Sequence, residues 1–264
     1  MNYRTKQYNT ILLNIKDNIA IIQFNRPQAM NALNREMGDE RNEILAGIAS
    51  DPEIRAVIIT GGEQVFCAGG DLVSFSKFGV VEAREYSQRI LAGQRLLAEL
   101  AKPTIAAVAG YALGGGMEIV LQCDLRIAAD NAKFAQPEIN VGIFPGAGAT
   151  QRLVQNTSIC KTKEIIFFGE MIDAPTALEL GIINKVVPLE ELMDTALKWA
   201  GKLAAKPPVA LRVAKAAINN AWSCDLETGI KMEADAWSML YGTEDQKEGM
   251  NAFLEKRKPF FNGN

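Results

Sequence analysis

Two glutamates stand beside glycine turns in otherwise apolar stretches of the chain. Glu118 follows the glycines at 114–116 and precedes the apolar residues 119–121. A glycine cluster ahead of a helix directs free backbone N–H groups toward whatever lies before the helix. An anion-stabilising backbone site with a semi-buried carboxylate beside it is the outline of an active site. The alternative is a tightly packed glycine turn with a capping carboxylate.

The second glutamate, Glu138, lies in the segment 136–148, which Pro137 and several glycines constrain. A single glutamate in a loop is usually solvated. Its neighbours Ile139 and Val141 are apolar, which favours a constrained site instead.

A second glycine turn follows another predicted buried strand. Gly61 and Gly62 come after residues 55–60, and the segment 65–72 contains Gly69 and Gly70. Ligands of α/β folds bind at such strand ends. Two glycine turns could therefore supply two N–H groups that converge on one oxygen, although a plain strand–loop connection is the alternative.

The chain contains no histidine. This excludes Ser-His and Cys-His nucleophile pairs and every metal site that needs imidazole. Any proton transfer near neutral pH must use carboxylates, lysine, tyrosine, cysteine or bound water. The four cysteines are scattered, without a CxxC pair, so we expect reduced thiols, no metal site and a cytoplasmic location.

The composition is that of a soluble globular enzyme. The 264 residues are 48% hydrophobic and 22% charged, enough for one large domain with or without a helical appendage. The net charge of −3 argues against nucleic acid or an anionic membrane as the main partner. The N-terminal residues lack the apolar core of a secretory signal.

The elements that must position these residues alternate between strands and helices. Residues 10–15 and 18–24 predict a hairpin, 31–49 a helix capped by Asn31 or Asn34, and 84–100 another helix. Buried strands are expected at 55–60, 105–108 and 124–129. Residues 72–81 are predicted as a loop that lines an acyl pocket or covers the core. From Glu190 onward the pattern is helical, and these helices must dock on the core or on another subunit.

Several motifs occur together in a fixed order. They are Asn25-Arg26-Pro27 with Asn31-Ala32-Leu33, FCAGGDL at 66–72, GYALGGGME at 110–118, QPE at 136–138, PGAG at 145–148 with TQRL at 150–153, and AFLEKRKP at 252–259. On these motifs the chain resembles the enoyl-CoA hydratase/isomerase (crotonase) family from about residue 11 to residue 258.

The resemblance implies an α/β fold, a crotonase-like spiral of strand–strand–helix units. It implies a core with the acyl-CoA site over residues 1–190 and a helical oligomerisation region over 191–264. Family members form trimers, often as dimers of trimers, so we expect a homo-oligomer.

The resemblance also implies the site. The substrate would be an acyl-coenzyme A thioester, with coenzyme A as part of the substrate and no other cofactor. The N–H groups of Ala68 and Gly115 would form the oxyanion hole, Glu118 and Glu138 would hold the water, and the N–H of Gly146 would support them. Substrate contacts are expected from Arg26, Ala68, Gly69, Gly70, Asp71, Leu72 and Gly115. Gln28 replaces a lysine that contacts coenzyme A in many members. Arg26, Lys256 and Lys258 are weak candidates for phosphate contacts, with the two lysines contributed by a neighbouring subunit; the alternative is that all three are solvated surface charges.

Both motif glutamates are present, which favours an enoyl-CoA hydratase that adds water across the 2,3 double bond of a 2-enoyl-CoA. We assign Glu118 as the base and Glu138 as the acid that protonates the α-carbon, although interacting carboxylates titrate as a pair. The alternatives are an enoyl-CoA isomerase or a hydratase for a branched or cyclic acyl group. An RNA-binding member is disfavoured by the net charge, and an inactive subunit by the two intact glutamates.

Overall fold

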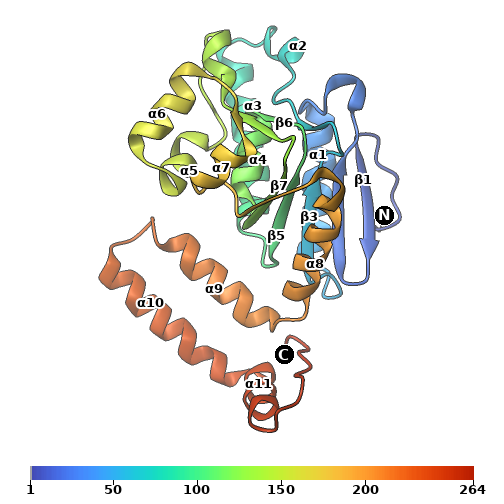
Figure 1. Cartoon of the computed structure of the whole chain (residues 1–264), viewed down its shortest axis with the longest axis vertical. Helices are drawn as coiled ribbons and strands as arrows, with labels where there is room; N and C mark the ends of the chain where they lie inside the picture. The colour runs from blue at the N-terminus through green and yellow to red at the C-terminus, as the bar shows by residue number, and fades with distance from the viewer. Residues whose placement is uncertain (1) are drawn as a thin grey trace.

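Two β-sheets form the core of the protein in a computed structural model that describes residues 2–264 (Figure 1). The larger sheet has the strand order β1-β2-β3-β5-β7-β10 and the smaller one β4-β6-β8-β9. The strands of the larger sheet are β1 (Ile11–Lys16), β2 (Ile19–Phe24), β3 (Ala56–Thr60), β5 (Thr104–Val108), β7 (Leu125–Ala129) and β10 (Lys185–Val187). Those of the smaller sheet are β4 (Val65–Cys67), β6 (Tyr111–Leu113), β8 (Lys133–Ala135) and β9 (Ile172–Asp173).

The chain passes alternately through the two sheets. A strand of the larger sheet is followed by one of the smaller sheet in the pairs β3–β4, β5–β6 and β7–β8. A helix then returns the chain, namely α3 (Val80–Ala98), α4 (Gly115–Gln122) and α5 (Ala149–Asn156). This order confirms the predicted spiral of strand–strand–helix units. The predicted hairpin is also confirmed, because β1 and β2 pair antiparallel.

The larger sheet is buried on both faces. Every residue of β3 and β5 is buried, and alternate side chains of each strand enter two different apolar clusters. Val57 and Ile59 pack in the cluster that contains α1 (Arg35–Ser50), whereas Ile58 packs in the cluster that contains α8 (Leu192–Ala204). Continuous apolar runs such as AVIIT are what a parallel strand covered on both faces requires.

Helix caps explain where two helices begin. Asn34 caps α1 by accepting a hydrogen bond from the Met37 N–H at 2.9 Å, so one of the two predicted caps is confirmed. Residues 72–81, predicted as a loop, instead contain α2 (Leu72–Phe75) and the first residues of α3. The Asp71 side chain caps α2, accepting from the Ser74 N–H at 3.3 Å; a short capped turn has too few residues to show helical periodicity.

Apart from the last three helices, the remaining elements of the chain are short. They are α6 (Ile159–Phe168), α7 (Ala174–Glu179) and the 3₁₀ turns η1 (Pro27–Ala29), η2 (Pro137–Val141), η3 (Leu189–Glu191) and η4 (Leu240–Gly242).

The last three helices extend away from the sheets (Figure 1). They are α9 (Pro208–Asn220), α10 (Leu226–Met239) and α11 (Glu244–Leu254). The predicted division at residue 190 precedes α8, but α8 packs on β2, β3, β5 and β7, so the extended region begins with α9. Within residues 2–264, no helix combines the length and the apolar character that a membrane span needs.

Candidate active site

The turn between β6 and α4 positions the first glutamate. Gly114 adopts a φ of +50° and donates its N–H to the Ala135 carbonyl of β8 at 2.9 Å. A left-handed φ is a conformation that glycine adopts without a steric penalty. The chain then enters α4, whose residues are buried from Gly116 to Gln122. Glu118 therefore lies in the first turn of a helix that is buried on all sides after Gly115.

The Glu118 carboxylate is held by two backbone N–H groups. It is 3% exposed, and its Oε1 accepts hydrogen bonds from Ala147 N at 2.7 Å and Ala149 N at 3.2 Å. Burial raises the pKa of Glu118, while these two hydrogen bonds act in the opposite direction. Its Oε2 has no hydrogen-bond partner within residues 2–264 and remains available for a ligand.

These two donors replace the one expected from the sequence. Gly146, predicted to support the site through its N–H, is exposed and donates no hydrogen bond to Glu118 in the described structure. The left-handed Gly148, with a φ of +106°, separates the two donors and turns both N–H groups toward the same oxygen. That geometry has no signature in the sequence beyond the glycine itself.

The second carboxylate lies against the same turn. Glu138 is in η2, and an ideal Cβ placed on Gly114 would come within 2.7 Å of Glu138 Oε1. Burial, together with the negative charge of Glu118, raises the pKa of Glu138 to about 7. The structure therefore brings together the two glutamates that the sequence singled out.

A buried amide accompanies Glu138. Gln136 is fully buried, and with its amide nitrogen turned toward Glu138 it donates to both carboxylate oxygens at 3.2 Å. Sequence reasoning included Gln136 in a motif but assigned it no role. A buried amide needs hydrogen-bond partners, and Glu138 provides them.

Two glycine N–H groups converge beside these carboxylates. An ideal Cβ on Gly115 would lie 3.8 Å from Gly70 N, and one on Gly69 would lie 3.7 Å from Gly115 N. Neither the Gly70 N–H nor the Gly115 N–H has an acceptor among the hydrogen bonds of residues 2–264. The Ala68 N–H, predicted as an oxyanion donor, instead donates to the Met30 carbonyl at 3.0 Å. The pair of free donors is therefore Gly70 and Gly115, and the prediction for Ala68 is corrected.

Asn31 holds the turn that carries Gly70. It is 1% exposed and its side-chain amide donates to the carbonyls of Gly61 at 2.9 Å and Val65 at 3.0 Å. Its Oδ1 accepts from the Arg26 N–H at 2.8 Å. Asn31 was predicted as a possible helix cap; instead it ties the chain before α1 to the second glycine turn. The sequence does not show this role, because it depends on the burial of Asn31 and on its φ of +55°.

The other predicted contact residues have mixed positions. The Arg26 guanidinium donates to the Ala32 carbonyl and lies 3.6 Å from the Asp71 carboxylate, so its charge is directed inward. Leu72, at the start of α2, is exposed. Lys256 and Lys258 follow α11, at the end of the molecule away from α4 (Figure 1), so within one chain they do not meet Glu118.

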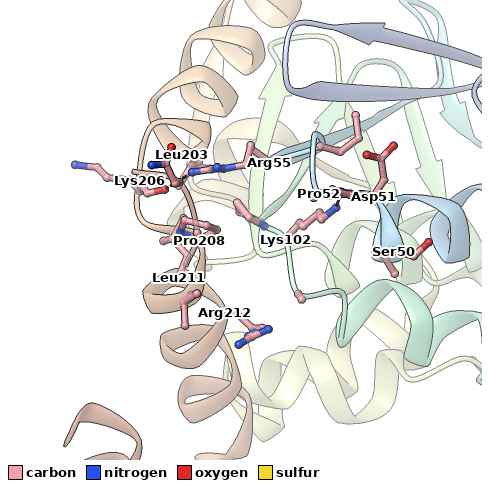
Figure 2. Close-up of a pocket in the computed structure, with 17 residues that line it drawn as sticks. Ser50, Asp51, Pro52, Arg55, Lys102, Leu203, Lys206, Pro208, Leu211 and Arg212 are labelled. Carbon is pink, nitrogen blue, oxygen red and sulfur yellow. Dashed lines mark hydrogen bonds between the residues drawn. The ribbon is translucent and has the colours of Figure 1, made fainter. Parts of the chain in front are cut away.

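A separate cavity of about 280 Å³ lies between the core and the start of α9 (Figure 2). Its lining includes Arg55, Lys102, Lys206 and Arg212, and none of the predicted site residues. Lys102 donates to the carbonyls of Ile48 and Asp51, which end α1. Arg55 donates to the Phe261 carbonyl at 3.1 Å. These cations hold backbone together where the C-terminal tail meets the core.

Comparison with known proteins finds relatives that are similar to this chain over nearly its whole length. The sequence profile described as "Enoyl-CoA hydratase/isomerase" matches residues 14–264. A "Short-chain-enoyl-CoA hydratase" of Clostridium acetobutylicum is 43% identical over 255 residues, which are 96% of this chain and 97% of that protein. A "Crotonyl-CoA hydratase" of Syntrophomonas wolfei is 42% identical over 255 residues, which are 96% and 98% of the two chains.

Solved structures agree with the sequence relatives. The crystal structure of an enoyl-CoA hydratase from Bacillus anthracis superposes with a TM-score of 0.93 at 38% identity and covers 97% of this chain and 100% of that one. An enoyl-CoA hydratase subunit from Geobacillus kaustophilus gives a TM-score of 0.94 at 38% identity, covering 98% and 100%.

Proposed function

The chain belongs to the enoyl-CoA hydratase/isomerase family, and on that premise we propose that Glu118 and Glu138 add water to the 2,3 double bond of a short-chain 2-enoyl-CoA. The chain is an enoyl-CoA hydratase, a hydro-lyase of the crotonase fold, and its substrate is an acyl-CoA thioester. The observation that carries the mechanism is the position of both carboxylates at Gly114.

The free N–H groups of Gly70 and Gly115 receive the thioester oxygen. Attack on the β-carbon converts the thioester into an enolate, and negative charge grows on that oxygen. Each well-aimed donor typically lowers the barrier by about 3 kcal/mol. The start of α4 at Gly115 adds the positive end of a helix dipole.

The water lies between the two glutamates. Glu118 acts as the base, because the N–H groups of Ala147 and Ala149 stabilise its ionised form and leave Oε2 for the water. Glu138 acts as the acid, because a pKa of about 7 keeps part of the population protonated near neutral pH. The proton that Glu118 removes from water and the one that Glu138 delivers to the α-carbon complete the addition.

This chemistry needs no cofactor beyond the coenzyme A of the substrate, since both protons move through carboxylates. Nucleic acid is not part of the proposal, because the net charge is −3. A cytoplasmic location is supported by four cysteines that are all free thiols.

A homo-oligomer, either a trimer or a dimer of trimers, is also proposed. Large apolar side chains are exposed along the extended helices α9 to α11: Ile218, Trp222, Leu226, Ile230, Trp237, Met239, Phe253 and Leu254. Exposed apolar surface on this scale is typical of a subunit interface. Analytical ultracentrifugation at several protein concentrations tests the state; a monomer at all of them contradicts this proposal.

The test of the reaction follows the absorbance of the conjugated thioester of crotonyl-CoA. We expect wild type to remove the band quickly, and Glu118→Gln and Glu138→Gln each to be slower by at least about a hundredfold. Glu170→Gln, an exposed glutamate outside the site, is the matched control and should retain full activity. If wild type leaves the band but converts a 3-enoyl thioester to the conjugated form, the protein is an isomerase and the proposed hydration is wrong.

A further inference from the structure

Helix α1 carries an arginine on its buried face. Arg41 is 6% exposed and stands among Met37, Ile44, Leu45 and Ile48. Its guanidinium makes one long hydrogen bond, from Nη2 to the Asn42 side chain at 3.4 Å, and its Nε has no partner in the described structure. No carboxylate of residues 2–264 forms an ion pair with it, and burial lowers its pKa.

A buried guanidinium without a counter-charge costs free energy, because it loses hydration that no partner replaces. The fold nevertheless makes room for it. On the facing helix α3, a Cβ at Gly93 would come within 2.7 Å of Arg41 Nη2. A larger residue at this position would displace the guanidinium, so α3 accommodates a cation in the core.

Two further polar side chains are buried on α3, which packs on α1, and on α4, which packs on α3. Gln94 follows Gly93 on α3 and is 7% exposed. Gln122 lies one turn after Glu118 on the same face of α4, is 3% exposed, and both atoms of its amide lack a partner in residues 2–264. Cys123, the next residue, lies close enough to Arg41 to affect its pKa.

Arg41, Gln94 and Gln122 are thus buried polar residues on three helices packed in series, and two of them border the turns of the candidate active site. Burial raises the pKa of Cys67 to about 12, and the positive charge of Arg41 acts against that shift; Cys67 begins the turn that presents Gly70. At the other turn, Gln94 Oε1 lies 3.8 Å from an ideal Cβ on Gly148, the residue between the two donors to Glu118. Arg41 therefore lies close to the turn that begins at Cys67, and Gln94 lies close to the turn that holds Glu118.

We propose that Arg41, assisted by Gln94 and Gln122, binds a carboxylate at the far end of the acyl group, so that the preferred substrates are 2-enoyl-CoA thioesters of dicarboxylic acids. This inference rests on the proposed hydratase function. A terminal carboxylate would supply the counter-charge that the protein itself lacks, through charge-assisted hydrogen bonds. An alkyl end would leave the guanidinium and the Gln122 amide unpaired.

The experiment compares two thioesters of equal length. Glutaconyl-CoA ends in a carboxylate, and 2-pentenoyl-CoA carries a methyl group in its place. The measured quantity is the ratio of kcat/KM for glutaconyl-CoA to kcat/KM for 2-pentenoyl-CoA, in wild type, Arg41→Met, Gln122→Met and Arg35→Met. Arg35 is exposed on the same helix and serves as the matched control.

We expect wild type to prefer glutaconyl-CoA, Arg41→Met to lower the ratio at least about tenfold, Gln122→Met to lower it less, and Arg35→Met to leave it unchanged. Arg41→Met should fold, because replacing a buried unpaired charge by an apolar side chain of similar volume is generally neutral or stabilising; a thermal melt checks this. If wild type hydrates both thioesters and Arg41→Met leaves the ratio unchanged, the inference is overturned and the proposed function stands. If wild type hydrates neither thioester nor crotonyl-CoA, the proposed function fails, and the inference with it.

Discussion

The Glu138 carboxylate lies directly against Gly114, so that a methyl group on this glycine would come within 2.7 Å of Glu138 Oε1. Gly114 also accepts the Glu118 N–H at 2.9 Å through its carbonyl. One glycine therefore sets the position of both carboxylates relative to each other.

Replacing Gly114 with alanine tests this relationship. We expect Gly114→Ala to lower kcat at least about a hundredfold, since the new methyl displaces the acid. It should also cost about 2 kcal/mol of stability, because a φ of +50° with a ψ of −122° is a conformation that only glycine adopts readily. Gly142 has a φ of +81° with no atom within 4 Å of its ideal Cβ. Gly142 is in the left-handed region, with a ψ of 16°, so Gly142→Ala should cost about 1 kcal/mol of stability and keep most of its activity. Equal losses of activity in the two variants would contradict the proposed contact.

The pH profile of hydration should report Glu138. With a pKa of about 7, Glu138 loses the proton it must donate as pH rises, so kcat/KM should decline above about pH 7. Steady-state rates from about pH 5 to about pH 9 measure this decline in kcat/KM. The residual activity of Glu138→Gln should show no decline at high pH. A decline that persists in that variant would mean that another group titrates.

Stability should change with pH through the same residue. The folded-state pKa of about 7 lies above the ordinary 4.5, so the folded state binds the proton more tightly than the unfolded state. The free energy of unfolding should therefore decrease as pH rises from about 4.5 to about 7. Urea denaturation of wild type and Glu138→Gln checks this: the variant should lose that part of the pH dependence and be the more stable protein above pH 7.

The buried amide of Asn31 should matter for both stability and rate. Asn31→Leu leaves the carbonyls of Gly61 and Val65 and the Arg26 N–H without their partner, which should cost about 2 to 4 kcal/mol. Because the same bonds hold the turn that presents Gly70, kcat should fall as well. Asn34→Ala, which removes a helix cap, should cost only about 1 kcal/mol and keep the rate. If Asn31→Leu retains wild-type kcat, the turn does not depend on this amide.

The sequence was sufficient to predict the carboxylates but not their hydrogen-bond donors. Glu118 and Glu138 stand out as charges within apolar segments, and the strands have the apolar runs that burial on both faces requires. Which N–H groups are free depends on backbone dihedrals several residues away. Ala68 could not be distinguished from Gly70 until the Ala68 N–H was found to donate to Met30. Arg41 lies on the apolar stripe of Met37, Ile44 and Leu45, but an arginine at such a position can extend its guanidinium to solvent, so the sequence did not show that the charge is buried.

The extended C-terminal helices have a spectroscopic consequence. The three tryptophans, Trp199, Trp222 and Trp237, all lie after residue 191, and Trp222 and Trp237 are mostly exposed in the single chain. Residues 1–198, which include Glu118 and Glu138, contain no indole. If the proposed homo-oligomer forms through these helices, its assembly should bury these two indoles and shift their fluorescence emission to shorter wavelength. A change in that emission when an acyl-CoA is added would show that the distant helices sense occupancy of the site.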